Sequence, residues 1–391
     1  MRDFINPVVR DIKPSGIRRF FDIAAEMDHV ISLGVGEPDF DTPWSIRETA
    51  IYSLEQGKTV YTANAGLKEL RLELASYTRR KYGLSYDPIR EILVTVGGSE
   101  AIDVALRAMV EPEDEVLIPE PSYVSYIPCV TLAGGTPVPV PLQGKNDFKL
   151  TVEDLEDKIT EKTKILIFPF PNNPTGSIMT REDMQPIAEF VKKHDLFVIT
   201  DEIYAELSYA EEPHVSLASL PGMRERCLVI NGFSKAFSMT GWRLGYAMGP
   251  EWLLAQMTKI HQFAIMCAPT TSQYAALNAL RSCDEEVAKM RREYNRRRRF
   301  VVNRFRQMGM ECFEPFGAFY AFPCIKQYGM SSEEFCSNLL YDQRVAVVPG
   351  SAFGDSGEGY IRVSYAYSME ELKVALDRIE EFVKTLDKNS N

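Results

Sequence analysis

One lysine in the chain has neighbours that favour chemical reactivity. Lys235 follows Ser234 in the stretch 231–245, NGFSKAFSMTGWRLG, which comes directly after the apolar run 227–230. Small, apolar and hydroxyl residues around an amine can hold it partly desolvated. Desolvation lowers the pKa of an amine and makes it a nucleophile toward carbonyls. The pattern indicates Schiff-base chemistry, although an ordinary lysine in a surface loop would fit the same local sequence.

Two features of the sequence suit a phosphate group. The predicted strand 91–96 runs into Gly97-Gly98-Ser99-Glu100 and then a helix, where backbone N–H groups and the helix N-terminus favour an anion. Arg243 adds a planar fork that can donate two hydrogen bonds to phosphate. The simpler interpretation of the first feature is that Ser99 merely caps the helix.

Two further polar residues follow predicted strands. Asn173, held out of helical conformation by Pro174, can present a side-chain amide to a cleft. Asp201 ends the apolar run 197–200, and a buried acid there needs a cation such as a protonated ring nitrogen. Turn formation by Asn173 and helix capping by Asp201 are the plainer alternatives. Taken together, the four sites match a phosphate-bearing pyridine aldehyde bound as an imine.

The elements that would position these residues alternate between helix and strand from about residue 44 to 248. Such alternation predicts an α/β fold, with a largely parallel sheet between helices, whose ligands lie outside the carboxyl ends of the strands. The C-terminal part predicts a smaller α+β domain. We expect an N-terminal arm over 1–44 that includes a helix at 17–27, a large domain over 45–282 and a small domain over 283–391. The arginine run 296–299 predicts a solvated face of a long helix.

Composition excludes several classes of protein. The chain has 391 residues, a net charge of −11 and a pI near 5.1, which disfavour general binding of nucleic acid or membrane surfaces. Seven scattered cysteines without a CxxC pair predict reduced thiols and a cytoplasmic protein. The four histidines lack zinc-ligand spacing, so we expect no metal site. No apolar run is long enough to predict a membrane span.

Nine segments in this order resemble one enzyme family along nearly the whole chain. They are SLGVGEPDF, YTANAGLKELR, VGGSEA, PEPSYVSY, PNNPTG, DEIYAEL, NGFSKAFSMTGWRLGY, PGSAFG and YIRVSYA. The chain resembles the class I, fold-type I aminotransferases that depend on pyridoxal 5'-phosphate (PLP), most of all the bacterial aspartate, aromatic and N-acetyl-diaminopimelate branch. The resemblance implies a large domain with a mostly parallel seven-stranded sheet, a smaller α+β domain, and transfer of an amino group to a 2-oxo acid such as 2-oxoglutarate.

The resemblance also implies roles for residues around the cofactor ring. Lys235 would form the Schiff base with PLP and shuttle the proton during the reaction. Asp201 would pair with the pyridine nitrogen, Asn173 and Tyr204 would bond the ring's phenolic oxygen, and Tyr123 would stack on the ring.

Further roles concern the cofactor phosphate and the substrate. Tyr61 would reach the phosphate from the partner subunit of a homodimer. Arg362 would bind the substrate α-carboxylate, assisted by Asn173 and the backbone near Gly36. The phosphate itself would lie against the backbone at Gly98, Ser99 and Glu100, with Ser234 and Arg243.

One departure from the family leaves the substrate open. Aspartate aminotransferases of another branch hold the side-chain carboxylate with an arginine upstream of a proline, but the stretch 261–269 has none. Lys13, Arg18 and His261 are candidate replacements, although each also fits an ordinary surface or core position. The residues do not exclude another PLP reaction on the same fold, such as a C–S β-lyase.

Overall fold

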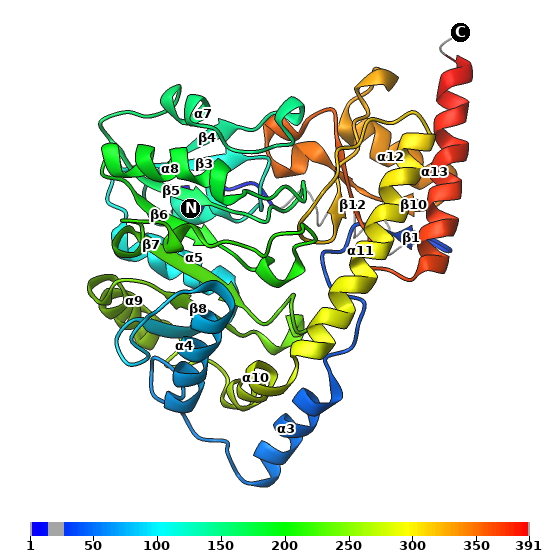
Figure 1. The fold of residues 1–391 in the computed structure, drawn as a ribbon. Coiled ribbons are helices and arrows are strands. Elements are labelled where there is room, and N and C mark those ends of the chain that lie inside the picture. Colours follow the sequence, from blue (N-terminus) through cyan, green and yellow to red (C-terminus); the bar gives the residue numbers. More distant parts are fainter. Residues whose placement is uncertain (1, 15–26, 390–391) are drawn as a thin grey trace.

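A seven-stranded sheet forms the larger part of the computed structural model, which describes residues 2–14 and 27–389 (Figure 1). Every neighbouring pair of strands is parallel except the two pairs that contain β8, which runs opposite to β2 and β7. The mostly parallel sheet of seven strands is therefore confirmed. In spatial order the strands are β2 (Ile92–Thr95), β8 (Gly245–Met248), β7 (Cys227–Gly232), β6 (Phe197–Asp201), β5 (Thr163–Phe168), β3 (Glu115–Glu120) and β4 (Thr136–Pro141).

Helices cover both faces of this sheet because its central strands are apolar on both sides. Along β5, Ile165 and Ile167 belong to one buried cluster, whereas Leu166 and Phe168 belong to another. The first cluster includes helices α5 (Gly97–Met109), α6 (Tyr126–Leu132) and α9 (Glu251–Ala264). The second includes α4 (Lys68–Tyr82), α8 (Arg181–Lys193) and α10 (Thr270–Ser282), and it continues into the C-terminal part. Burial on both faces explains why these strands read as continuous apolar runs.

Two small sheets lie in the C-terminal part of the molecule. β1 (Ile31–Ser32) pairs in parallel with β10 (Val345–Ala346), so the N-terminal segment joins this part. β12 (Ile361–Ser364) pairs antiparallel with β11 (Val348–Pro349) and β9 (Tyr320–Ala321). Helices α11 (Asp284–Gln307), α12 (Ser332–Gln343) and α13 (Met369–Asn389) accompany them, with α11 crossing diagonally toward α10 (Figure 1). The domain boundaries at 44/45 and 282/283 stay a prediction.

Most predicted elements are present within a few residues, including α3 (Trp44–Glu55) and α7 (Val152–Glu156). Three helices were not predicted: α1 (Pro7–Asp11), α6 and α9. α1 is only five residues long, and α6 is apolar along its length and contains a proline, so neither has a clear helical pattern. The predicted helix 17–27 falls almost wholly on 15–26, outside the described residues.

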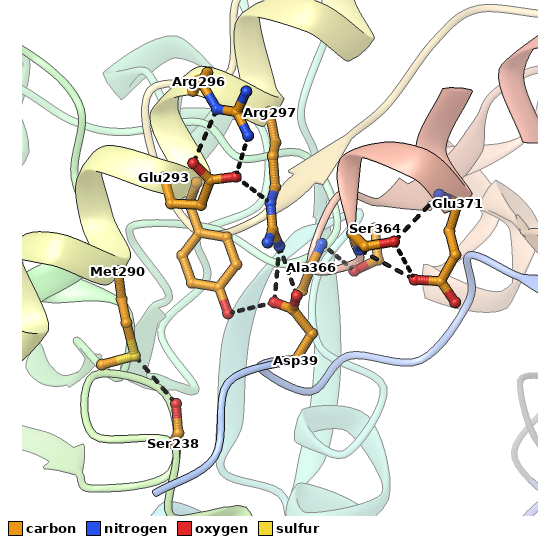
Figure 2. A network of polar contacts seen from close by, with 11 residues as sticks. Asp39, Ser238, Met290, Glu293, Arg296, Arg297, Ser364, Ala366 and Glu371 are labelled. Atoms are coloured by element: carbon orange, nitrogen blue, oxygen red, sulfur yellow. Dashed lines mark hydrogen bonds and ion pairs between the residues drawn. The ribbon is translucent and has the colours of Figure 1, made fainter. Parts of the chain in front are cut away.

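The arginine run on α11 differs from the expectation. Arg296 and Arg299 are exposed, as a solvated face requires, but Arg297 and Arg298 are buried. Arg297 bonds Asp39 and Glu293 (Figure 2), and Arg298 pairs with Glu314. The prediction of a solvated face is therefore wrong for these two residues, because helical periodicity alone does not show what packs against each side.

No helix among residues 2–14 and 27–389 is both long and apolar enough to cross a membrane. The described residues also contain no group of histidine, cysteine and acidic side chains that could hold a metal ion. All seven cysteines are free thiols.

Candidate active site

A cavity of about 400 Å³ opens at the carboxyl ends of the parallel strands. Its volume is within the range of sites that hold small molecules and cofactors. Its walls come from the large sheet, from the segment after β1 and from β9 and β12, so distant parts of the chain meet there. The polar residues of the lining are Glu37, Ser99, Tyr123, Tyr126, Asn173, Asp201, Tyr204, Ser234, Lys235, Thr240, Arg243, Tyr320 and Arg362.

Lys235 enters this cavity from the loop that follows β7. Its Nζ donates a hydrogen bond to the carbonyl oxygen of Gly36 at 2.6 Å. It also lies 5.9 Å from the ring centre of Tyr204 and 5.8 Å from that of Phe319. Burial lowers the pKa of the Lys235 amine to about 8, with Arg362 and Arg243 acting in the same direction. About a tenth of the amine is thus unprotonated and nucleophilic at pH 7, far more than for an ordinary lysine.

Asp201 is the last residue of β6, and its carboxylate is buried. Tyr126 donates to its Oδ2 at 2.8 Å, and the backbone N–H of Ile203 donates to its Oδ1 at 3.1 Å. Burial raises the pKa of Asp201, while the bond from Tyr126 opposes the rise. A carboxylate has about four lone-pair positions, so these two bonds leave capacity for a cationic ring nitrogen.

The start of α5 faces the same cavity. α5 begins at Gly97, which has φ of +78°. The N–H groups of Gly98 and Ser99 lie in the first turn of the helix and therefore have no partner within it. A Cβ at Gly97 would lie 2.7 Å from Arg243 Nη2, so the guanidinium packs directly on this glycine. A helix start with a close arginine is an anion site.

Arg362 lies in β12 on the opposite side of the cavity, and it is buried. Its Nη1 donates to Asn173 Oδ1 at 2.9 Å and its Nη2 donates to the carbonyl oxygen of Gly34 at 2.5 Å. Within the described residues, nothing accepts a hydrogen bond from its buried Nε. Burying such a donor without a partner is costly, which indicates that a ligand acceptor completes this site.

Tyr204 and Tyr320 also line the cavity. The hydroxyls of Tyr204 and Tyr320 are 2.8 Å apart, and burial raises the pKa of Tyr204 well above its usual value. The Arg362 guanidinium lies over the Tyr320 ring at 4.5 Å. Tyr123 lies across the cavity, with its hydroxyl 3.4 Å from Ser99 Oγ.

The other predicted residues that the structure describes lie outside the cavity lining. Glu100 is in the first turn of α5, and its predicted backbone contact with the phosphate stays a prediction, while its carboxylate bonds His261 Nδ1 at 2.6 Å. His261 is fully buried, so its role as a replacement for the missing arginine is wrong, and its core position is the correct interpretation. Tyr61 is 79% exposed and lies beside 267–271. Lys13 is exposed, and Arg18 lies outside the described residues.

Four polar residues of the lining were not singled out from the sequence, and one of them, Thr240, lies inside the segment NGFSKAFSMTGWRLGY. Tyr126 and Glu37 lie inside the segments PEPSYVSY and SLGVGEPDF. The sequence therefore marked the two segments but did not indicate a role for either residue. Tyr320 has no such signal, because it approaches Tyr204 only through the packing of β9. In sum, the cavity joins a reactive amine, a buried acid, an anion site and a second, unsatisfied guanidinium.

Comparison with known proteins supplies the context for this arrangement. Residues 28–379 match the family model described as aminotransferase class I and II. YugH, a Bacillus subtilis protein whose aminotransferase name is itself provisional, is 56% identical over 98% of this chain and 99% of its own length. An aspartate aminotransferase of Pyrococcus abyssi is 49% identical over 95% and 96% of the two chains. The crystal structure of an aromatic aminotransferase from Pyrococcus horikoshii superimposes with a TM-score of 0.90 at 45% identity, covering 95% and 99%.

Proposed function

The chain belongs to the class I and II aminotransferases, PLP-dependent enzymes that transfer amino groups, and we propose that the cavity around Lys235 is its active site. The observation that carries the proposal is the position of the Lys235 amine. It lies in one cavity with the carboxylate of Asp201 and the guanidinium of Arg362, and burial lowers its pKa to about 8. An amine in this state suits capture of a carbonyl carbon.

The residues of the cavity fit PLP at each of its functional groups. The glycines at the start of α5 leave room for Arg243 to pack closely, which suits a phosphate at that point. Ser234 adds a hydroxyl to the lining. Asp201 has spare acceptor capacity for a protonated ring nitrogen. Tyr123 offers an aromatic face, and its position in the lining supports stacking on the ring.

When bound, PLP supplies an aldehyde that captures amino groups and a ring that withdraws electrons from the substrate Cα. The chain's own residues do the rest. Asp201 keeps a proton on the ring nitrogen, and Lys235 Nζ accepts and returns the proton of the Cα. Tyr204 and Asn173 orient the ring oxygen by hydrogen bonding. These roles divide acid–base work between a carboxylate that stays charged and an amine that titrates.

Arg362 binds the α-carboxylate that every amino acid and 2-oxo acid substrate carries. Its free Nε is an unused donor, and its planar guanidinium can form paired hydrogen bonds with a carboxylate. Asn173 and the carbonyl of Gly34 hold the other nitrogens, so the guanidinium is oriented before the substrate arrives. The backbone near Gly36 borders the same space.

The amino donor is of the aspartate, aromatic or N-acetyl-diaminopimelate type, with 2-oxoglutarate as an acceptor. Names of the relatives support all three types. Among the described residues, the cations that line the cavity are Lys235, Arg243 and Arg362, and each already has a partner in this scheme. A panel of donors, each added without a 2-oxo acid and followed by loss of the visible cofactor absorbance, ranks the donors directly, and 2-oxoglutarate added afterwards should restore the absorbance.

We place the enzyme in the cytoplasm as a homodimer. Enzymes of this family are typically dimeric, and Tyr61 of one subunit would reach the phosphate bound by its partner. The exposure of Tyr61 supports this arrangement, as do the neighbouring exposed apolar side chains of Val60, Phe263 and Met266. The seven free thiols support a reducing compartment.

The experiment that tests the assignment compares the wild type with Lys235→Ala. We expect the purified wild type to show visible cofactor absorbance and amino transfer, and the variant to lose both. Cofactor-free wild type in the presence of excess PLP would contradict the proposal. Release of pyruvate and ammonia from a sulfur amino acid without a 2-oxo acid would instead support the β-lyase alternative.

A further inference from the structure

Residues 34–40, called the cavity loop below, border the active site and are anchored at both ends. At the first end, the preceding Leu33 accepts a hydrogen bond from Ser364 N and donates one to the carbonyl of Ala346, each at 2.8 Å. These bonds tie the loop to β12 and β10. Backbone bonds of this kind are common beside a sheet. They hold only the first end of the cavity loop.

The second end is held by an ion pair in which the arginine is buried and the Asp39 side chain is 24% exposed. Arg297 Nη1 lies 2.8 Å from each carboxylate oxygen of Asp39 (Figure 2). Tyr294 donates to the same carboxylate at 3.3 Å. The Arg297 guanidinium also lies over the rings of Phe40 and Tyr294, at 5.3 and 5.6 Å, and its side chain is only 7% exposed. An arginine that is buried, paired and stacked has little freedom to move.

Arg297 is itself oriented by its own helix. Glu293, one turn earlier on α11, accepts from Arg297 Nε at 3.0 Å and also bonds Arg296 (Figure 2). The guanidinium therefore connects the rigid helix α11 to the cavity loop. A charge pair of this kind is a poor source of stability but a good source of fixed geometry.

Between its anchors the loop holds both cations that act on the substrate. The carbonyl of Gly34 accepts from Arg362, and the carbonyl of Gly36 accepts from Lys235. The loop also packs tightly, because a Cβ at Gly36 would lie 2.6 Å from the Tyr320 hydroxyl. A small shift of the loop must therefore move the hydrogen-bonding positions of Arg362 and Lys235.

We propose that Arg297 is a positioning residue for amino transfer, acting through Asp39 and the cavity loop on Arg362. The inference rests on the proposed role of Arg362 as the α-carboxylate site. The ion pair holds the carbonyls of Gly34 and Gly36 where they accept hydrogen bonds from Arg362 and Lys235. The Arg362 guanidinium is thereby kept oriented toward a carboxylate ligand. The phosphate side of the cavity does not depend on this pair.

Asp39→Asn in the holoenzyme is the direct test, because it removes the charge but keeps the size of the side chain. We expect KM for the amino donor and for the 2-oxo acid to rise by the same factor, about tenfold, with a smaller change in kcat. The dissociation constant of PLP should stay as in the wild type. A folding defect alone would lower the amount of active enzyme and leave KM unchanged.

A binding measurement gives a readout that does not depend on turnover. Succinate and 3-phenylpropionate are carboxylates without an amino group, and either can be titrated into the holoenzyme by its visible absorbance. The one that the wild type binds should bind Asp39→Asn about tenfold more weakly. Arg297→Lys, which keeps the charge but loses the planar fork, should give an intermediate loss.

Glu314→Gln is the matched control. It removes the same charge from Glu314, the partner of Arg306 and of the adjacent arginine Arg298, which is also buried but contacts Asn295, Tyr209 and Phe316. We expect this variant to lose stability without a change in KM or carboxylate binding. Equal KM shifts in the two variants, or no shift in Asp39→Asn, would overturn the inference.

Arg362→Lys separates this inference from the proposed function. If Arg362→Lys raises KM and Asp39→Asn does not, the carboxylate site stands and only the role of Arg297 is wrong. If Arg362→Lys has no effect on KM, the proposed function of that site is wrong as well.

Discussion

Lys235 is the residue on which the chemistry depends, and its pKa makes a direct prediction about pH. Below its pKa the amine carries a proton and has no lone pair for a carbonyl carbon. Because burial lowers the pKa of Lys235 to about 8, the rate of PLP uptake by the apoenzyme should rise through pH 8 and level off above it. An ordinary lysine would still be gaining reactivity near pH 10. Stopped-flow absorbance from pH 6.5 to 10 measures the profile, and a rise centred near 10 would refute it.

Tyr126 gives a second prediction at this scale. Its hydroxyl donates to Asp201 Oδ2, and the bond stabilises the charged carboxylate. In Tyr126→Phe the pKa of Asp201 should rise, so the acid limb of the kcat profile should move to higher pH and kcat should fall about tenfold. Tyr209→Phe, which removes another hydroxyl bonded within the protein, is the control. An unchanged acid limb in Tyr126→Phe would show that this bond does not tune Asp201.

At the scale of elements, helix α8 can be tested apart from the chemistry. Thr180 accepts from the N–H of Asp183, and the Asp183 carboxylate accepts from the N–H of Thr180, which forms a capping box. Thr180→Ala should lower the free energy of unfolding by about 1 kcal/mol in urea titrations. Kinetic constants should not change, because α8 contributes nothing to the cavity lining. Thr180→Ser, which keeps the hydroxyl, should restore stability.

The elements also show how far the sequence predicts this structure. The inner strands of the large sheet were predictable because burial on both faces gives short apolar runs, and polar residues at or directly after their ends mark the cavity. Helix α9 was missed although it is a full helix, and the burial of Arg297 was missed because its partner Asp39 is remote in the chain. Periodicity gives the faces of a helix, whereas tertiary packing decides which face is buried.

At the scale of the whole molecule, the homodimer makes a prediction about complementation. Tyr61→Phe should weaken PLP binding about tenfold, because the hydroxyl would be lost from the partner's phosphate site. Mixing Tyr61→Phe with the inactive Lys235→Ala variant should then restore one site with normal PLP affinity, because the hybrid combines Lys235 of one chain with Tyr61 of the other. Failure of the mixture to regain that affinity would show that Tyr61 acts within its own subunit or not at all.

The cofactor side and the carboxylate side of the cavity also differ in how far apart their residues lie in the chain, and this separation should affect the order in which the two sides fold. Lys235 and Arg243 are carried by the loop between the paired neighbours β7 and β8, whereas the bond between Gly34 and Arg362 spans 328 residues. Contacts between near neighbours close sooner than contacts across long loops. During refolding from urea with PLP present, visible cofactor absorbance should therefore return before carboxylate binding and turnover. The enzyme would recognise its cofactor first and acquire its substrate site last.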